Sequence, residues 1–110
     1  MYIENVKSQM RKGMLEYSIM LLLRDRPFYT SDIIDALEKA NLIVVEGTLY
    51  PLLSRLRKEG ILDYEWQESS QGPPRKYYKL TQAGCEALAI LDANWNNLTE
   101  TIAQIKDITI

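Results

Sequence analysis

The chain has 110 residues, one cysteine, no histidine and a formal net charge of −2. Its length predicts one domain, and its hydrophobic content of 46% and charged content of 25% are ordinary for a globular protein. Without histidine, the chain lacks the residues of a His/Cys zinc site, a Ser-His-Asp triad or a Cys-His nucleophile. We see no paired acids or Gly-rich phosphate loop either, and therefore expect no catalytic site, no metal site and no cofactor.

The sequence also predicts the cellular location of the protein. No run of about 18 uncharged apolar residues is present, so we expect no transmembrane helix and no membrane partner. The N-terminal sequence MYIENVKSQMRK is polar where a signal peptide needs its apolar segment. The single cysteine, Cys85, cannot form an intrachain disulfide, which agrees with a reducing compartment. The cytoplasm is the expected location.

The first part of the chain is basic and then apolar. Residues 1–8 are expected to form a mobile arm or a short helical lead-in. Lys7, Arg11 and Lys12 follow one another without an intervening acid, and they either reach a phosphate or form a solvated cationic turn. Apolar residues at helical spacing then predict a helix from Met14 to Arg24.

A second helix is predicted after a short bridge. Thr30, Ser31 and Asp32 are three consecutive N-cap candidates, so the helix should begin near residue 31. It should end near Asn41, a residue that tolerates the left-handed conformation. The β-branched segment Leu42–Val45 is expected to be extended and to pair with the hairpin that follows later.

The segment EGTLYPLLSRLRKEG, residues 46–60, predicts a third helix. Its leucines recur at helical spacing and should point into a core: Leu49, Leu52, Leu53 and Leu56. The outward side is polar and cationic, with Tyr50, Pro51, Ser54 and Lys58 at its centre and Thr48, Arg55 and Arg57 on its flanks. Pro51 is expected close to the first turn, where a missing N–H costs least, and Gly60 supplies a helix stop.

A β-hairpin is predicted next. Residues 61–68 alternate, so Leu62, Tyr64 and Trp66 should share one face. The stretch 69–74 contains a glycine and two prolines and is predicted to be the loop. The return strand, residues 75–80, has Tyr78 and Leu80 facing inward.

Two helices joined by a short link and followed by a hairpin form a winged helix-turn-helix, in which the second helix enters the major groove and the hairpin holds flanking phosphates. For base readout we expect Thr48, Tyr50, Pro51, Ser54 and Lys58. For phosphate contacts we expect Arg55, Arg75, Lys76 and Tyr29. Alternatively, Tyr50 and Pro51 only pack on the neighbouring helix, and the basic pair of the hairpin is only a solvated face.

From Gln82 onward the chain is predicted to be one long helix with Thr81 as its N-cap. Its apolar residues alternate spacings of three and four, as in a heptad seam: Leu88, Leu91, Trp95, Leu98, Ile102 and Ile105. One small domain cannot cover so long a seam, so we expect it to meet a second copy of the chain. Part of it could instead pack on the first helix of the same chain.

The segments RKGMLEYSIMLLL, TLYPLLSRLRKEG and GPPRKYYKLTQAG together resemble the PadR family of bacterial transcriptional regulators, over roughly residues 8–105. The resemblance implies a mostly α fold with a small β-hairpin: a winged helix-turn-helix over residues 1–80 and a C-terminal dimerisation helix over residues 81–110. It implies a sequence-specific DNA-binding regulator, a repressor, that binds a near-palindromic operator as a homodimer. The wing departs from the family pattern in two ways. Pro73 and Pro74 stiffen it, and it is less basic than the wings of many family members.

Multidrug-responsive members of the family place a tryptophan beside a pore between subunits that holds flat aromatic ligands. Carried onto this chain, the resemblance implies a site for a small aromatic or hydrophobic effector lined by Trp95, Leu88, Leu91 and Asp92, with Leu15 and Glu16 facing them from the first helix. Simple packing of Trp95 is the alternative. Two other functions stay open: a winged helix that binds proteins, and a small-molecule-binding protein without DNA binding.

Overall fold

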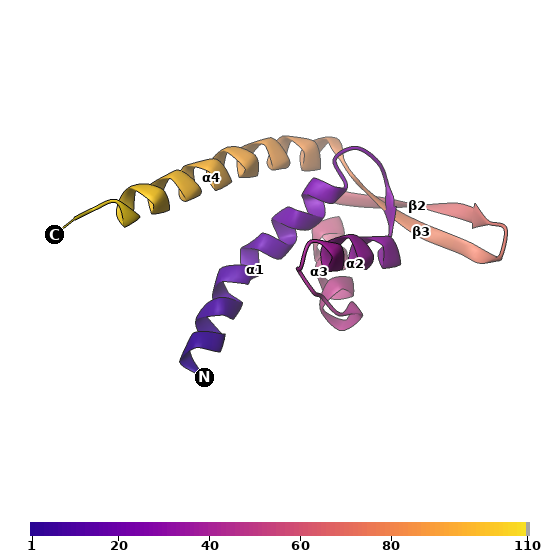
Figure 1. Ribbon diagram of the computed structural model, residues 1–110. Coiled ribbons are helices and arrows are strands. Elements are labelled where there is room, and N and C mark those ends of the chain that lie inside the picture. Colours follow the sequence, from indigo (N-terminus) through magenta and orange to yellow (C-terminus); the bar gives the residue numbers. More distant parts are fainter. Residues whose placement is uncertain (110) are drawn as a thin grey trace.

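A computed structural model describes residues 1–109 and contains, over that range, four helices and three strands. The elements are α1 (Tyr2–Leu22), β1 (Phe28–Tyr29), α2 (Thr30–Lys39), α3 (Glu46–Lys58), β2 (Leu62–Ser69), β3 (Gly72–Leu80) and α4 (Gln82–Lys106). The hairpin β2–β3 projects from one side of the molecule, and α1 and α4 extend from the other (Figure 1), which gives extents of 63 × 34 × 23 Å. The predicted winged helix-turn-helix with a long C-terminal helix is confirmed.

The sheet has three antiparallel strands in the order β1-β3-β2, one more than the predicted hairpin. The third strand is β1, in which Phe28 pairs with Tyr78 and Tyr29 with Tyr77. The prediction that residues 42–45 pair with the hairpin was wrong, because this segment is a connection without strand pairing. Its apolar residues are divided: residues 42 and 44 pack against the core, while residues 43 and 45 face solvent.

The hydrophobic core joins all the elements of the winged helix. It consists of Ile19 and Leu23 from the first helical segment, Ile33 and Leu37 from α2, Leu49, Leu53 and Leu56 from α3, and Leu62 and Tyr78 from the sheet. Each fully buried aliphatic side chain contributes roughly 1.5–3 kcal/mol. Three of the four predicted leucines of α3 are buried, and Leu52 is partly buried. The core thereby fixes which side of α3 faces away from the protein.

Helix α1 differs from its prediction at both ends. It runs without a break from Tyr2 to Leu22, so the first residues are not a mobile arm but lead helically into the predicted helix, as the second alternative expected. The ion pair between Lys7 and Glu4, 3.9 Å apart at i,i+3 spacing, supports its first turns. It ends two residues before Arg24, and Arg24 lies in the turn that leads to β1.

The local signals for the other helix ends had mixed outcomes. Asn41 (φ 65°) and Gly60 (φ 79°) adopt the left-handed conformation predicted after their helices. Helix α2, however, begins at Thr30 and has no side-chain cap hydrogen bond. The Thr30 side chain is buried in the interior, and Tyr29 is the N-cap residue.

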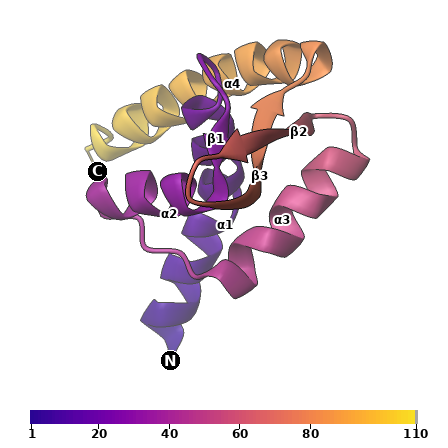
Figure 2. The ribbon, with the colours of Figure 1, turned by 90° about the vertical axis from the view of Figure 1, so that its right-hand side faces the viewer.

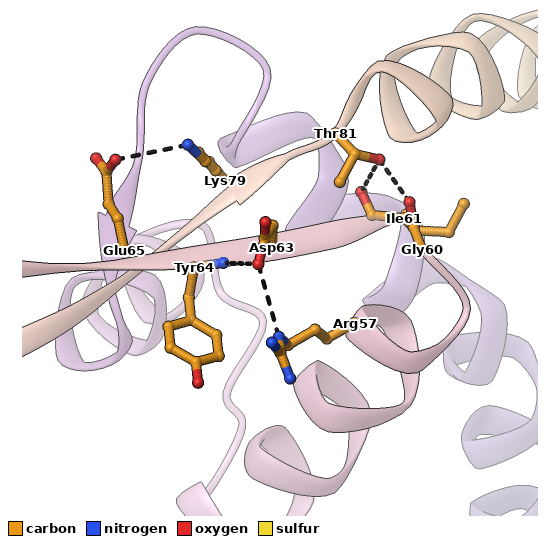
Figure 3. A network of polar contacts seen from close by, with 8 residues as sticks. All are labelled: Arg57, Gly60, Ile61, Asp63, Tyr64, Glu65, Lys79 and Thr81. Carbon is orange, nitrogen blue, oxygen red and sulfur yellow. Dashed lines mark hydrogen bonds and ion pairs between the residues drawn. The ribbon is translucent and has the colours of Figure 1, made fainter.

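Thr81 is the predicted N-cap of α4, and its hydroxyl accepts a hydrogen bond from the Gly84 amide at 3.0 Å. The same oxygen lies 2.5 Å from the Gly60 carbonyl oxygen and 3.1 Å from that of Ile61 (Figure 3). Gly84 is buried directly against the Ile61 carbonyl, with no room for a β-carbon. The end of α3 and the start of α4 are therefore joined at one tight contact.

Helix α4 begins on the winged helix and then leaves it (Figures 1 and 2). Leu88 is buried near its start, whereas Leu98, Ile102 and Ile105 are 50%, 51% and 56% exposed. The predicted seam is therefore covered within this chain only at its N-terminal end. Among residues 1–109, no helix has the length and hydropathy that crossing a lipid bilayer would need.

Candidate nucleic-acid interface

The outward side of α3 is open to solvent (Figure 2). The five residues expected to read bases are all exposed there: Thr48, Tyr50, Pro51, Ser54 and Lys58. Tyr50 keeps 47% of its surface exposed, so about half of its side chain is open to contact. This side offers hydroxyl groups, one apolar ring and one ammonium group, and such groups can meet base edges in a major groove.

Pro51 lies inside α3, past its first turn, which corrects the prediction that it would lie close to the helix start. It cannot donate the hydrogen bond that the Gly47 carbonyl would otherwise accept, and a proline at such a position destabilises a helix by about 3 kcal/mol. The three buried leucines on the opposite side hold α3 in place despite this loss. Pro51 and Gly47 are both exposed, so the unpaired carbonyl is on the solvent side.

The arginines on the flanks of α3 are bound within the protein. Arg55 donates to the carboxylate of Glu16 on α1 and to that of Glu59 at 3.4 Å. The hydrogen bond to Glu16 is the main reason that the pKa of Arg55 is raised. Arg57 pairs with Asp63 at 3.6 Å (Figure 3). Lys58, in contrast, forms no ion pair with any residue from 1 to 109, so its charge is free on the outward side.

The tip of the wing is shorter than predicted. Strand β3 begins at Gly72, so Pro73 and Pro74 lie in the strand and only residues 70 and 71 form the turn. The pairing shifts between Gln67 and Ser69, which marks a β-bulge. Proline has no N–H for a ladder, and bulges are one of the few places where strands accept it.

Arg75 and Lys76 of β3 point to opposite faces of the hairpin, because successive side chains of a strand alternate. The Arg75 guanidinium lies 4.9 Å from the centre of the Tyr29 ring, on one face. The Lys76 ammonium lies 4.3 Å from the centre of the Tyr64 ring, on the face to which α3 is packed. Lys76 therefore lies on the hairpin face that is turned toward α3, whereas Arg75 and Tyr29 form a separate pair on the other face.

A second feature lies in the angle between α1 and α4, where a pocket of about 260 Å³ opens beside Trp95. Leu91 and Trp95 of the predicted ligand set line it, and Asp92 accepts a hydrogen bond from the Tyr17 hydroxyl next to it. This bond raises the pKa of Tyr17. Leu88 is buried at the winged helix and is not among the lining residues.

Leu15 and Glu16 do not face Trp95 within this chain. They line a different pocket, of about 610 Å³, between α1, α3 and the connection that precedes α3. The residues that α1 presents to Trp95 are Met10, Met14 and Tyr17, and the Tyr17 and Trp95 ring centres are 5.9 Å apart. Their spacing of four and three residues is a one-sided helical pattern, and it is the sequence signal that could have identified them.

The chain has clear relatives. The model of the family described as "Transcriptional regulator PadR-like family" matches residues 19–90. The chain is 65% identical to a PadR-like transcription factor from Bacteroides fragilis, with a TM-score of 0.78 over 92% of this chain and 98% of that one. It is 34% identical to a PadR-like transcriptional regulator from Bacillus cereus, with a TM-score of 0.84 over 93% of this chain and 100% of that one. A PadR family transcriptional regulator from Eggerthella lenta is 28% identical, with a TM-score of 0.86 over 98% and 95%.

Proposed function

Because the chain belongs to the PadR-like family of transcriptional regulators, which are not enzymes, we propose that it represses transcription by binding a near-palindromic operator as a homodimer. The observation that carries this proposal is the outward side of α3, where Thr48, Tyr50, Pro51, Ser54 and Lys58 are exposed. The wing adds Lys76 on its face turned toward α3. The proposal places the protein in the cytoplasm, with the DNA.

In this proposal the residues have different roles. The outward residues of α3 contact base edges and specify the sequence, while Lys76 holds a phosphate and sets the position. Arg75, stacked on Tyr29, holds a phosphate on the other side of the wing. Arg55, the remaining residue of the predicted phosphate set, can reach DNA only by leaving Glu16 and Glu59.

The exposed stripe of α4 supports the homodimer. Leu98, Ile102 and Ile105 continue the heptad pattern beyond the winged helix and are about half exposed. Together with Leu88, Leu91 and Trp95 they form the seam that we assign to the interface. A stripe of this kind is stabilised when a second copy covers it. Twofold symmetry would then place two α3 helices about one DNA turn apart.

The pocket beside Trp95 supports a regulatory role for a small hydrophobic or aromatic effector. It lies between α1, which also carries the Glu16–Arg55 contact to α3, and α4, which carries the dimer stripe. A ligand that changes the angle between these helices changes the distance between the two α3 helices and so relieves repression. Titration of purified protein with flat aromatic dyes tests this, because a dye that binds the dimer without weakening its DNA affinity would rule the mechanism out.

DNA binding is tested by fluorescence anisotropy, with labelled DNA from upstream of the protein's own gene and an unrelated duplex of equal length. We expect saturable binding that favours the upstream DNA and weakens steeply with salt. The Lys58→Ala and Lys76→Ala variants should bind more weakly, and Lys76→Ala should reduce the salt slope by about one.

The matched control for these variants is Lys106→Ala, which removes the same charge from the far end of α4 and should leave DNA affinity unchanged. Equal, weak binding of both duplexes by the unmodified protein would contradict the repressor and favour a winged helix that binds proteins. Tight dye binding together with negligible DNA binding would favour a small-molecule-binding protein instead.

A further inference from the structure

The inner face of the wing carries an aromatic and cationic strip, of which the assigned contacts use only Lys76. In the β2–β3 ladder, Tyr64 pairs with Tyr78 and Trp66 pairs with Lys76, so these four side chains share one face of the hairpin. The Arg57 guanidinium of α3 lies 4.4 Å from the centre of the Tyr64 ring, which identifies this face as the one turned toward α3 (Figure 3).

We call Arg57, Tyr64, Lys76 and Trp66 the wing strip. The Tyr64 and Trp66 rings meet edge to face with centres 6.1 Å apart. The Lys76 ammonium lies close to both rings, 4.3 Å from the Tyr64 ring centre and 5.6 Å from that of Trp66. The strip is therefore continuous from α3 to the outer part of the wing.

Trp66 differs from the other aromatic residues of the strip in its exposure. Tyr78 is buried in the core and Tyr64 is half-buried beneath Arg57, but Trp66 keeps 62% of its surface in solvent. It belongs neither to the hydrophobic core nor to the side chains packed against it. A single exposed apolar side chain needs no explanation. An exposed indole that contacts both a tyrosine ring and a lysine ammonium is a different case, because these neighbours fix its position.

The charges on the two faces of the wing are distributed unevenly. Glu65 lies on the other face, where it pairs with Lys79 at 3.5 Å (Figure 3). Asp63 is paired with Arg57. Lys76 has no ion-pair partner among residues 1–109. Between Trp66 and the turn, the one acidic residue is Glu68, beside the bulge. The face with Trp66 thus offers an unpaired cation next to a flat apolar ring.

We propose that Trp66, held by Lys76 and Tyr64, packs on the sugar–phosphate backbone of duplex DNA next to the segment that α3 reads. The flat indole suits the apolar side of a deoxyribose, and its N–H can donate to a phosphate oxygen while Lys76 supplies the charge. Such a contact positions the wing and carries no base specificity. This inference rests on the proposed DNA binding and adds a residue to it that the sequence patterns did not assign.

The test compares the full chain with Trp66→Ala and Trp66→Phe in the anisotropy experiment on both duplexes. Trp66→Ala removes one N–H donor and its apolar contact and should weaken binding roughly two- to tenfold. The loss should be similar for the upstream and the unrelated duplex, because the contact is independent of sequence. Trp66→Phe should keep most of the affinity, since it preserves an apolar ring.

Tryptophan emission gives a second readout. The chain has two tryptophans, Trp66 and Trp95, so Trp66→Phe leaves only Trp95 to report. DNA should quench the emission of the unmodified protein, and this quenching should be absent from the Trp66→Phe variant. The matched control is Tyr2→Ala, which removes an exposed aromatic side chain far from the wing, and it should bind DNA like the unmodified chain.

The outcomes separate this inference from the proposed function. If the unmodified chain binds the upstream DNA but Trp66→Ala binds equally well, the DNA-binding function stands and the role of Trp66 is refuted. A loss confined to the upstream duplex would also refute it, because it would show base readout. If the unmodified chain binds neither duplex, both proposals fail.

Discussion

The winged helix and the outer half of α4 use the same kinds of side chain in opposite ways. In the winged helix, Ile19, Leu49 and Leu53 have no measurable exposure, whereas Leu98 and Ile102 of α4 are about half exposed. One region completes its core within a single chain, and the other presents an apolar stripe that this chain does not cover. The stability of the first should therefore depend on intrachain packing, and that of the second on association.

The largest effect should come from the core of the winged helix. Leu53→Ala removes a fully buried side chain of α3 and should lower the free energy of unfolding by about 2–5 kcal/mol, measured by urea denaturation. The control is Ile90→Ala on α4, where the side chain is 70% exposed and lies outside the stripe. Equal losses for the two variants would mean that burial does not distinguish the regions.

The junction between the two regions should be nearly as sensitive. Gly84→Ala places a methyl group against the Ile61 carbonyl, where Thr81 also bonds, and should cost about 1–3 kcal/mol by overpacking. Gly13→Ala is the matched control, because it lies in α1 with open space around it, and there alanine should be neutral or stabilise by up to about 1 kcal/mol. A stable Gly84→Ala protein would show that the junction can shift.

A charge in the stripe should separate association from folding. Ile102→Asp should give a monomer by light scattering, with a change in the unfolding free energy of the isolated chain within about 0.5 kcal/mol. Its melting temperature should lose the concentration dependence that we expect of the unmodified dimer. Ile90→Asp introduces the same charge outside the stripe and should remain dimeric. A dimeric Ile102→Asp variant would locate the interface elsewhere.

The smallest effect should be at the Tyr17–Asp92 contact between α1 and α4. The hydrogen bond raises the pKa of Tyr17 above its ordinary value of 10.0. Its contribution to stability is therefore complete below pH 10 and is lost as the pH rises through the raised pKa. The melting temperatures of Tyr17→Phe and the unmodified chain should differ at neutral pH and converge at alkaline pH. A difference that stays constant up to pH 11 would contradict this, and Tyr2→Phe is the exposed control.

Local sequence signals predicted those helix ends that depend only on neighbouring residues. Asn41, Gly60 and Thr81 act at their helix ends as expected, because left-handed turns and hydroxyl caps need only neighbouring atoms. Strand β1 was not predicted, since a strand of two residues exists only because Tyr77 and Tyr78 pair with it. The segment 42–45 has strand-like residues but no strand partner.

The candidate sites show the same division. The spacing of the leucines in α3 predicted which side is buried, and hence which residues face outward. The periodicity of α1 predicted an apolar face but did not say which neighbour covers each part of it. In the structure, Met10 and Met14 face Trp95, whereas Leu15 faces the connection before α3. Trp66 is a similar case: its alternation with Tyr64 predicted that the two share a face, but it did not predict how exposed Trp66 is.

The two prolines of the wing have a consequence for solubility. Over residues 72–76, β3 has β2 on one side and no strand on the other, since β1 pairs only with Tyr77 and Tyr78. An open strand edge can recruit strands from other molecules and start aggregation. Pro73 and Pro74 offer no N–H to such a strand, and the bulge beside them disturbs the register that it would need. The open edge of β3 is therefore a poor template for a strand from another molecule.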